Sequence, residues 1–428
     1  MTLFEIIATL LSISAVFSWL NDRYLRLPTT IGLMLIALLC SLGLLLLPPD
    51  SLQEEIRQML ESIHFDDTLL HGLLSFLLFA GALHVDLNDL ARQKWVIVIL
   101  ATASVMGATL IIGGGAYLLF QLLGLDVPFI YCVLFGALIS PTDPIAVLGV
   151  LKSAGAPESL KTKIAGESLF NDGVAVVVFL TIAGIAIGGH EATTLGFLEL
   201  FGREAVGGVL FGLLTGGLAF LMLYRIDNYQ VEVLVTLALA TGGYALAEHL
   251  HLSAPIAIVV AGLLIGNAGR KWAMSEKTRR HLDDFWELVD EVLNAVLFVL
   301  IGLEVLVISL RPDYILAGAL AIPLVLVARL ISVGLPIGIM RRFRSFSTGV
   351  TSILTWAGLR GGISVALALS LPSGETRDIL VTVTYVIVVF SILVQGLTLG
   401  PLVRRMGARA ELELSRTQLA SAESAAED

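Results

Sequence analysis

Glu167, Ser168, Asn171 and Asp172 form the densest group of polar side chains inside an apolar stretch of this chain. On a helix, the pairs Glu167/Asn171 and Ser168/Asp172 are each four residues apart and form adjacent stripes on one surface. Carboxylate and hydroxyl oxygens are hard ligands, which suit a small alkali cation. A desolvated carboxylate also binds a proton readily, and it holds either the cation or the proton. The group therefore indicates a site where the two compete, with Asp172 as the first candidate for the carrier.

Asp143 is the second candidate carboxylate, because prolines stand two residues before it and directly after it. Proline removes a backbone donor and disfavours helix in the residue before it. We expect the helix to unwind here and Asp143 to meet Ser168 and Asp172 at one point. The alternative interpretation is that both aspartates only cap the ends of broken helices.

Arg329 and Arg360 are the two cations inside apolar runs. An unpaired buried charge is severely destabilising, so each arginine needs a partner, and Glu167 is the expected partner of Arg360. We interpret both arginines as members of structural ion pairs rather than as direct ion ligands. Three glycines stand within two residues of Arg360, which predicts a second break in the helix there.

The composition identifies the surroundings of these residues as a membrane. Of 428 residues, 57% are hydrophobic and 14% are charged, whereas a soluble domain has about 25% charged residues. The formal net charge of -10 opposes nucleic-acid binding. Neither a zinc-ligand spacing nor a nucleotide-binding loop is found, so we expect no cofactor. The predicted fold class is an all-α polytopic membrane protein.

Stretches long enough to span the bilayer as helices occur thirteen times. They cover about 2–20, 28–47, 67–85, 95–123, 128–151, 163–187, 203–224, 231–250, 254–269, 285–308, 313–340, 347–371 and 377–403.

The basic residues predict the orientation of these helices. Twenty of the 26 Lys and Arg residues lie in the loops after odd-numbered helices and in the tail at 404–428. Only Arg57, Arg203, Arg311 and Arg377 lie in the other loops. Basic loops stay in the cytoplasm. This places the N-terminus on the outer side of the cell (inner) membrane and the short C-terminal tail in the cytoplasm.

The two predicted breaks occupy matching positions. The first is in the fifth helix of helices 1–6, and the second is in the fifth helix of helices 8–13. These two blocks have opposite orientation, which predicts two inverted six-helix repeats joined by helix 7. Broken helices at equivalent places in inverted repeats indicate the binding site of a secondary transporter. Helix 7 itself carries Gly208, Gly212 and Gly216 on one face, which predicts close packing within the chain or across a dimer.

Three motifs resemble those of the monovalent cation:proton antiporters of the NhaP/NHE type. They are Thr142-Asp143-Pro144, Gly166-Glu167-Ser168-Leu169-Phe170-Asn171-Asp172-Gly173 and Gly358-Leu359-Arg360-Gly361-Gly362. The likeness extends over roughly residues 5–403. It implies a sodium/proton exchanger that works as a homodimer. A core of about 95–187 and 313–403 would move against a dimerisation domain of about 1–90 and 203–308.

The resemblance also implies roles for single residues. The cation would be held by Asp172, Ser168, Asp143 and the backbone carbonyl of Thr142. Asn171 would hold the broken helices in place, Glu167 would pair with Arg360, and an Asn before the aspartate implies electroneutral exchange.

One departure leaves the ion preference open. Ala80 stands where many relatives carry an acidic residue, so Li⁺ or K⁺ is a further candidate substrate beside Na⁺. Two other functions remain as alternatives: an intramembrane aspartyl protease using Asp143 and Asp172 as a dyad, and a cation channel or sensor. The expected partners are the transported cation, H⁺, membrane lipids and a second copy of the chain.

Overall fold

The structure, a computed structural model, describes residues 3–46, 57–58, 60, 65–153, 158–188, 194–343 and 349–406. Within these ranges the chain is helical and contains no strand. The longer helices are α1 (Leu3–Leu20), α2 (Thr29–Leu46), α5 (Leu74–Leu83), α6 (Leu87–Leu122), α7 (Phe129–Ile139), α8 (Pro144–Ser153), α9 (Glu158–Gly188), α10 (Thr194–Leu223), α11 (Tyr229–His249), α12 (Ala254–Leu264), α13 (Glu276–Leu303), α14 (Pro312–Met340), α15 (Val350–Trp356), α16 (Gly362–Leu369) and α17 (Glu375–Phe390). Shorter pieces are α4 (Phe65–Asp67) and the π-helical turns η1 (Asn21–Leu25), η2 (Thr68–Leu73), η3 (Ile265–Ala273) and η5 (Ser391–Gln395). Most of the predicted tail, from residue 407 onward, lies outside the described residues.

Each of the thirteen predicted spanning segments contains helix. In the described ranges, nine helices are long and apolar enough to cross a membrane. α13 is not among the nine because its first half is strongly charged, and the helices on either side of the two breaks are too short. The all-helical membrane class is confirmed, whereas the count of thirteen spans, the inverted repeats and the orientation stay predictions.

Four helices, α6, α9, α10 and α13, begin at least five residues earlier than predicted. α13 starts at Glu276 instead of near residue 285, because the Ser275 hydroxyl accepts a hydrogen bond from the backbone N–H of Thr278 and caps the helix. α6 starts at Leu87 instead of near residue 95. Its first two turns mix polar and apolar residues, so the hydropathy pattern alone does not reveal them.

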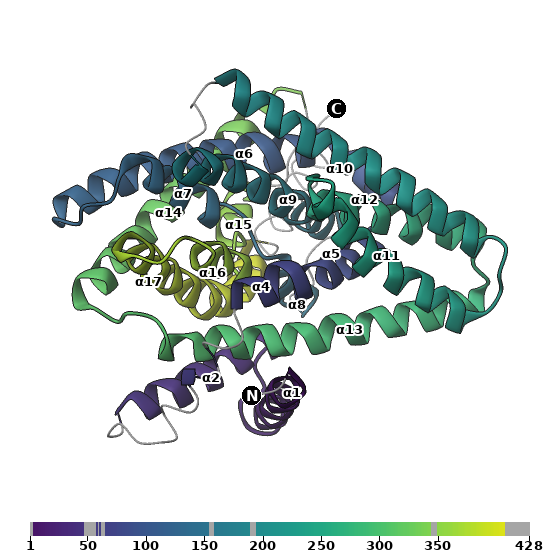
Figure 1. Cartoon of the computed structure of the whole chain (residues 1–428), viewed down its shortest axis with the longest axis horizontal. Helices are drawn as coiled ribbons and strands as arrows, with labels where there is room; N and C mark the ends of the chain where they lie inside the picture. The colour runs from purple at the N-terminus through teal and green to yellow at the C-terminus, as the bar shows by residue number, and fades with distance from the viewer. Residues whose placement is uncertain are drawn as a thin grey trace, which may run out of the picture.

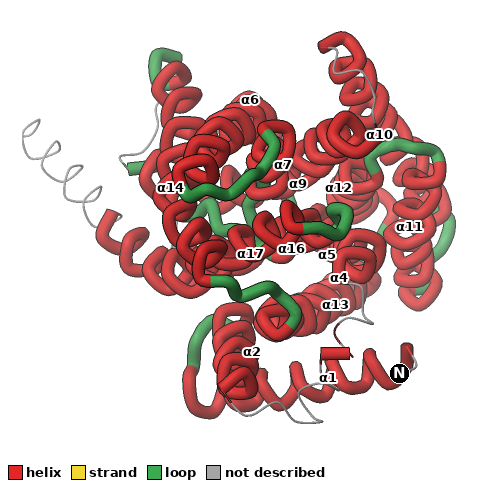
Figure 2. The backbone as a smooth tube through the Cα atoms, turned by 60° about the vertical axis from the view of Figure 1, so that its left-hand side comes forward, coloured by secondary structure: helices red, strands yellow, loops and turns green. Residues whose placement is uncertain are grey.

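The helices pack in two groups (Figure 1). α6 packs against α7, α9 and α14, while α17 packs against α14 and α16. In the other group, α12 packs against α5, α10 and α11. α13 packs mainly against α2, α5 and α1 and runs along one side of the molecule, with α1 and α2 beyond it in both views (Figures 1 and 2). A cavity described below is lined by α5 of the second group and by α9 and α16.

The glycine face of α10 packs within the chain. A methyl group at Gly208 would lie 2.7 Å from the carbonyl oxygen of Ser253, and one at Gly216 would lie 3.0 Å from the Cα of Ala261. Gly212 approaches the backbone of Ala257 in the same way. These glycines therefore let α10 and α12 come close together, as small residues do in membrane bundles.

Candidate functional site

Both predicted breaks are present in the structure. α7 ends at Ile139 and α8 begins at Pro144, with an unwound segment between them. α15 ends at Trp356 and α16 begins at Gly362, again with unwound chain between. In an uninterrupted helix the carbonyl of Ser140 would accept from the N–H of residue 144, but that residue is proline and has none. The first break therefore leaves backbone acceptors that need other donors.

The second break supplies those donors, because the two unwound segments, 140–143 and 357–361, lie against each other. We call this contact the crossing. Arg360 Nη1 donates to the carbonyl oxygens of Ser140 at 2.5 Å and Pro141 at 2.8 Å. The backbone N–H of Asp143 donates to the carbonyl of Leu359 at 2.8 Å. A charged donor to a buried carbonyl makes a strong hydrogen bond, so Arg360 fastens one break to the other.

Gly361 permits this crossing. A methyl group at its position would lie 2.5 Å from Oδ2 of Asp143 and 2.8 Å from its Cβ. The absence of a side chain is what allows the second break to approach Asp143 so closely.

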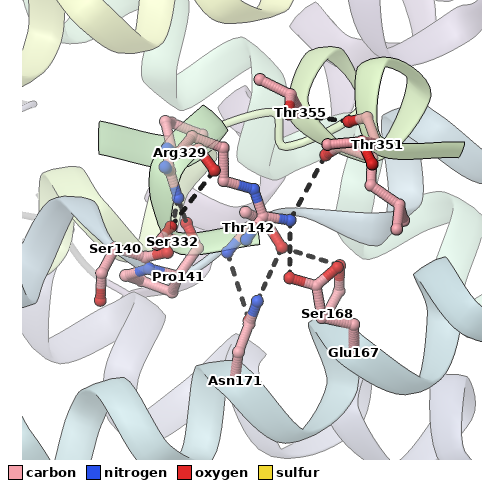
Figure 3. A network of polar contacts seen from close by, with 12 residues as sticks. Ser140, Pro141, Thr142, Glu167, Ser168, Asn171, Arg329, Ser332, Thr351 and Thr355 are labelled. Atoms are coloured by element: carbon pink, nitrogen blue, oxygen red, sulfur yellow. Dashed lines mark hydrogen bonds and ion pairs between the residues drawn. The ribbon is translucent and has the colours of Figure 1, made fainter. Parts of the chain in front are cut away.

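Asn171 and Ser168, both on α9, hold Thr142 of the first break (Figure 3). Asn171 Nδ2 donates to Thr142 Oγ1 at 2.8 Å, and the backbone N–H of Thr142 donates to Asn171 Oδ1 at 3.3 Å. The hydroxyls of Thr142 and Ser168 are 2.9 Å apart. All three residues are buried, so the network fixes the unwound segment on α9.

A cavity of about 200 Å³ opens beside the crossing. Its polar lining is made by Thr142, Asp143, Asp172, Asp290 and Ser364, while leucines of η2 and α5 form much of the remaining wall. Oxygen donors without nitrogen or sulfur ligands suit an alkali cation. In the described residues, no group of three His, Cys, Asp or Glu side chains could hold a metal ion together.

The predicted pairing of Glu167 with Arg360 is wrong. Glu167 Oε1 lies 2.6 Å from Nη2 of Arg329, and both side chains are almost completely buried. Arg360 instead turns to the carbonyls that the first break leaves without backbone donors. Arg329 is therefore the partner of the buried glutamate, and Arg360 is the link between the breaks.

The family model for the transmembrane sodium/hydrogen exchangers matches residues 8–405. The chain belongs to the sodium/hydrogen exchanger family.

Individual relatives agree with this assignment. The chain is 54% identical over 418 residues to the Na⁺/H⁺ antiporter NhaP of Pseudomonas aeruginosa, covering 96% of this chain and 99% of that one. It is 37% identical over 390 residues to the antiporter NhaH of Halobacillus dabanensis, covering 90% and 93%. Among solved structures, the sodium proton antiporter MjNhaP1 of Methanocaldococcus jannaschii superposes with a TM-score of 0.74 at 19% identity, covering 95% and 99%. At that identity the superposition shows the shared fold.

This exchanger brings some of the predicted site residues together and leaves others apart. Asp143, Asp172 and Thr142 line one cavity. Ser168 does not line it, because its hydroxyl turns to Thr142. Ala80 is buried and lines a neighbouring cavity instead.

Two polar residues that the sequence motifs did not single out, Ser364 and Asp290, line the same cavity. Ser364 follows the glycines of the second break by two positions, so the predicted break was a sequence signal that could have identified it. Asp290 is an acidic residue inside the predicted span 285–308. Such a residue is a functional candidate by default, and that signal could have found it.

Proposed function

We propose that this chain is a secondary active antiporter that exchanges Na⁺, or Li⁺ or K⁺, for H⁺ by alternating access, and that serves pH and sodium homeostasis. The cation and the proton compete for Asp172, with Asp143, Ser168 and the Thr142 carbonyl as further ligands. Asn171 and Arg360 hold the breaks, while Glu167 and Arg329 stabilise the core behind them.

The observation that carries this proposal is the environment of the Asp172 carboxylate. Its side chain is 4% exposed, lines the oxygen-rich cavity at the crossing and, within the described residues, makes no hydrogen bond or ion pair. A buried carboxylate without a fixed partner favours either protonation or a bound cation. Protein partners do not satisfy Asp172, so a transported ion is what completes the site.

The charges carried by the two breaks and by the helices α9 and α14 support a one-for-one exchange; Asp290 is outside this count because it belongs to α13, which carries neither break. Arg329 and Arg360 contribute two positive charges to this cluster, and Glu167, Asp143 and Asp172 contribute three negative ones. One Na⁺ or one H⁺ makes the cluster neutral, whereas the empty cluster carries an uncompensated charge. Moving such a charge through a low-dielectric bundle is costly. Only the forms loaded with Na⁺ or H⁺ are then expected to move the site from one side of the membrane to the other. This couples the two ions without net charge movement.

The proposal includes the larger architecture. Thirteen spans would place the N-terminus outside and the C-terminus in the cytoplasm of the inner membrane. Two inverted repeats would form a core of about 95–187 and 313–403, which moves against a dimerising part of about 1–90 and 203–308 in a lipid-embedded homodimer. The packing of α6 against α7 and α14, and of α12 against α5, α10 and α11, supports this division, with α9 as the helix that contacts both groups.

The alternatives of a protease and a channel lose support. Family membership is with transporters, and in an aspartyl protease dyad the two carboxyl groups would be expected to share a catalytic water. Here Asp143 is fixed by the crossing, where its backbone bonds Leu359 and its side chain packs on Gly361.

The test replaces Asp172 with Asn. In everted vesicles holding a proton gradient reported by a pH-sensitive dye, Na⁺ should dissipate the gradient with the unmodified protein. Asp172→Asn should abolish that response, because the neutral amide cannot exchange a proton for a cation.

Asp126→Asn is the matched control, since Asp126 is an exposed loop residue and should retain full activity. Monodisperse elution of both variants in detergent checks folding. Na⁺-dependent proton flux through folded Asp172→Asn would exclude Asp172 as the carrier.

A further inference from the structure

A second cavity adjoins the one that contains Asp143 and Asp172. It has a volume of about 480 Å³, and its charged lining comprises Asp86, Lys161, Glu287 and Asp290, with His84 beside them. Since water takes up about 30 Å³ per molecule in the liquid, this space accommodates a hydrated cation. The two cavities share part of their lining, so they are adjacent, and the shared residues form their junction.

Asp290 is the only charged residue among the described residues that lines both cavities. The other shared residues are Gly81, Pro144, Leu148 and Leu169. The junction is therefore apolar except for one carboxylate. A cation that passes from the larger cavity to Asp172 must pass Asp290.

The sequence of α13 places a line of polar groups along these two cavities. Glu287, Asp290 and Leu297 line the cavities, and their spacings of three and seven residues put them on one helix face. Asn294, four residues after Asp290 on the same face, is buried.

We propose that Asp290 is a positioning residue for the entering cation. It holds a hydrated Na⁺ at the junction of the two cavities, before the ion sheds water and reaches Asp172. This role rests on the proposed function and adds a third carboxylate to it, one that comes from outside the two broken helices.

The role is confined to one side of the membrane. His84, Asp86 and Lys161 lie in or next to the segments 86–94 and 152–162, which the distribution of basic residues assigns to the cytoplasm. α13 packs chiefly against α2, α5 and α1 and only slightly against α16 of the crossing. When the broken helices turn their site to the other side, Asp290 stays with the packing partners of α13. It therefore aids loading from the cytoplasm alone.

The experiment measures the KM for Na⁺ on each side separately. In everted vesicles Na⁺ reaches the cytoplasmic face, and in right-side-out vesicles it reaches the outer face. Asp290→Asn should raise the cytoplasmic KM about fivefold, as expected for removing one charge from a water-filled cavity. The outer KM and kcat should stay unchanged, and Asp290→Glu should restore the cytoplasmic KM.

Glu291→Gln is the matched control. Glu291 is the next acidic residue on α13, it is exposed and it lines neither cavity, so its loss should leave both KM values unchanged. An unaltered cytoplasmic KM in Asp290→Asn, an equal rise on both sides, or complete loss of exchange in the folded variant each overturns the role of Asp290. An unaltered Asp290→Asn with inactive Asp172→Asn refutes only this role, whereas active Asp172→Asn refutes the proposed carrier itself.

Discussion

Asn171 fastens the unwound segment to α9 through both ends of its amide group. Its Nδ2 donates to the hydroxyl of Thr142, and its Oδ1 accepts from the backbone N–H of the same residue. No regular helix supplies that N–H with a partner, since the chain is unwound there. The amide thus replaces a missing backbone bond and orients Thr142 toward the cavity that Asp172 lines.

Asn171→Ala should destabilise the protein and weaken cation binding. The variant leaves the buried N–H of Thr142 without a partner, which costs about 1–3 kcal/mol. Thermal unfolding in detergent should show the loss as a lower Tm, and the KM for Na⁺ should rise because the break is no longer fixed. Asn88→Ala removes the same group from an exposed position and should change neither value; an unaffected Tm in Asn171→Ala would contradict the clamp.

Polar residues inside apolar runs could be recognised from the sequence, but their partners could not. Asp143 and Asp172 stand out because charges are costly in a membrane, and the structure places both at one cavity. The partner of Glu167 was predicted wrongly, since helical spacing relates residues on one helix and is silent about neighbouring helices. Arg329 reaches Glu167 from α14, a contact that depends on how α9 and α14 pack.

The two breaks act as one element, although more than 200 residues separate them along the chain. Each leaves backbone groups without helical partners, and the crossing satisfies groups of both. Arg360 donates to the carbonyls of Ser140 and Pro141, while the carbonyl of Leu359 accepts from the backbone N–H of Asp143. A rearrangement of either break therefore disturbs the other. This mutual dependence makes the crossing one unit, on which the proposed ion site lies.

Gly361→Ala tests the crossing. The backbone at Gly361 has φ -121° and ψ -161°, which any residue adopts, so the effect arises from the added methyl group alone. That group would overlap Asp143 and should cost about 1–3 kcal/mol as an overpacking change, seen as a lower Tm together with a higher KM for Na⁺.

Gly242→Ala serves as the comparison, because a methyl group there meets nothing within 4 Å. In the middle of α11 it should be neutral or stabilise by about 0.5–1 kcal/mol. Equal behaviour of the two variants would show that the close approach of the breaks is unimportant.

At the element level, sequence reasoning succeeded where local chemistry decides the outcome. Prolines around Thr142 and glycines around Arg360 predicted both breaks. The start of α13 was missed because the Ser275 cap precedes charged turns that hydropathy does not detect. Asp290 was missed for a related reason: its importance comes from two cavities formed by several helices, which the pattern of one helix does not contain.

The whole molecule combines a fold that tolerates sequence change with a small charged centre. The structure of MjNhaP1 keeps this fold at 19% identity, as expected when most positions need only be apolar and of suitable size. The buried charges are far more restricted, because each one must be balanced inside a medium that solvates it poorly. In the proposed mechanism, the balance of two arginines against three carboxylates sets how many ions move per cycle.

The exchange should generate no current. A cycle that moved one net charge would respond to the membrane potential by about 2.3 kcal/mol per 100 mV, whereas neutral loaded forms do not respond. On a solid-supported membrane, a Na⁺ concentration jump should therefore give no sustained current, although the pH-sensitive dye records proton flux in the same preparation. Asp172→Asn supplies the baseline of both signals. A sustained current that grows with the proton flux would mean that the cluster takes up more than one positive charge per cycle, and Asp290 would then be the next carboxylate to test as a second proton carrier.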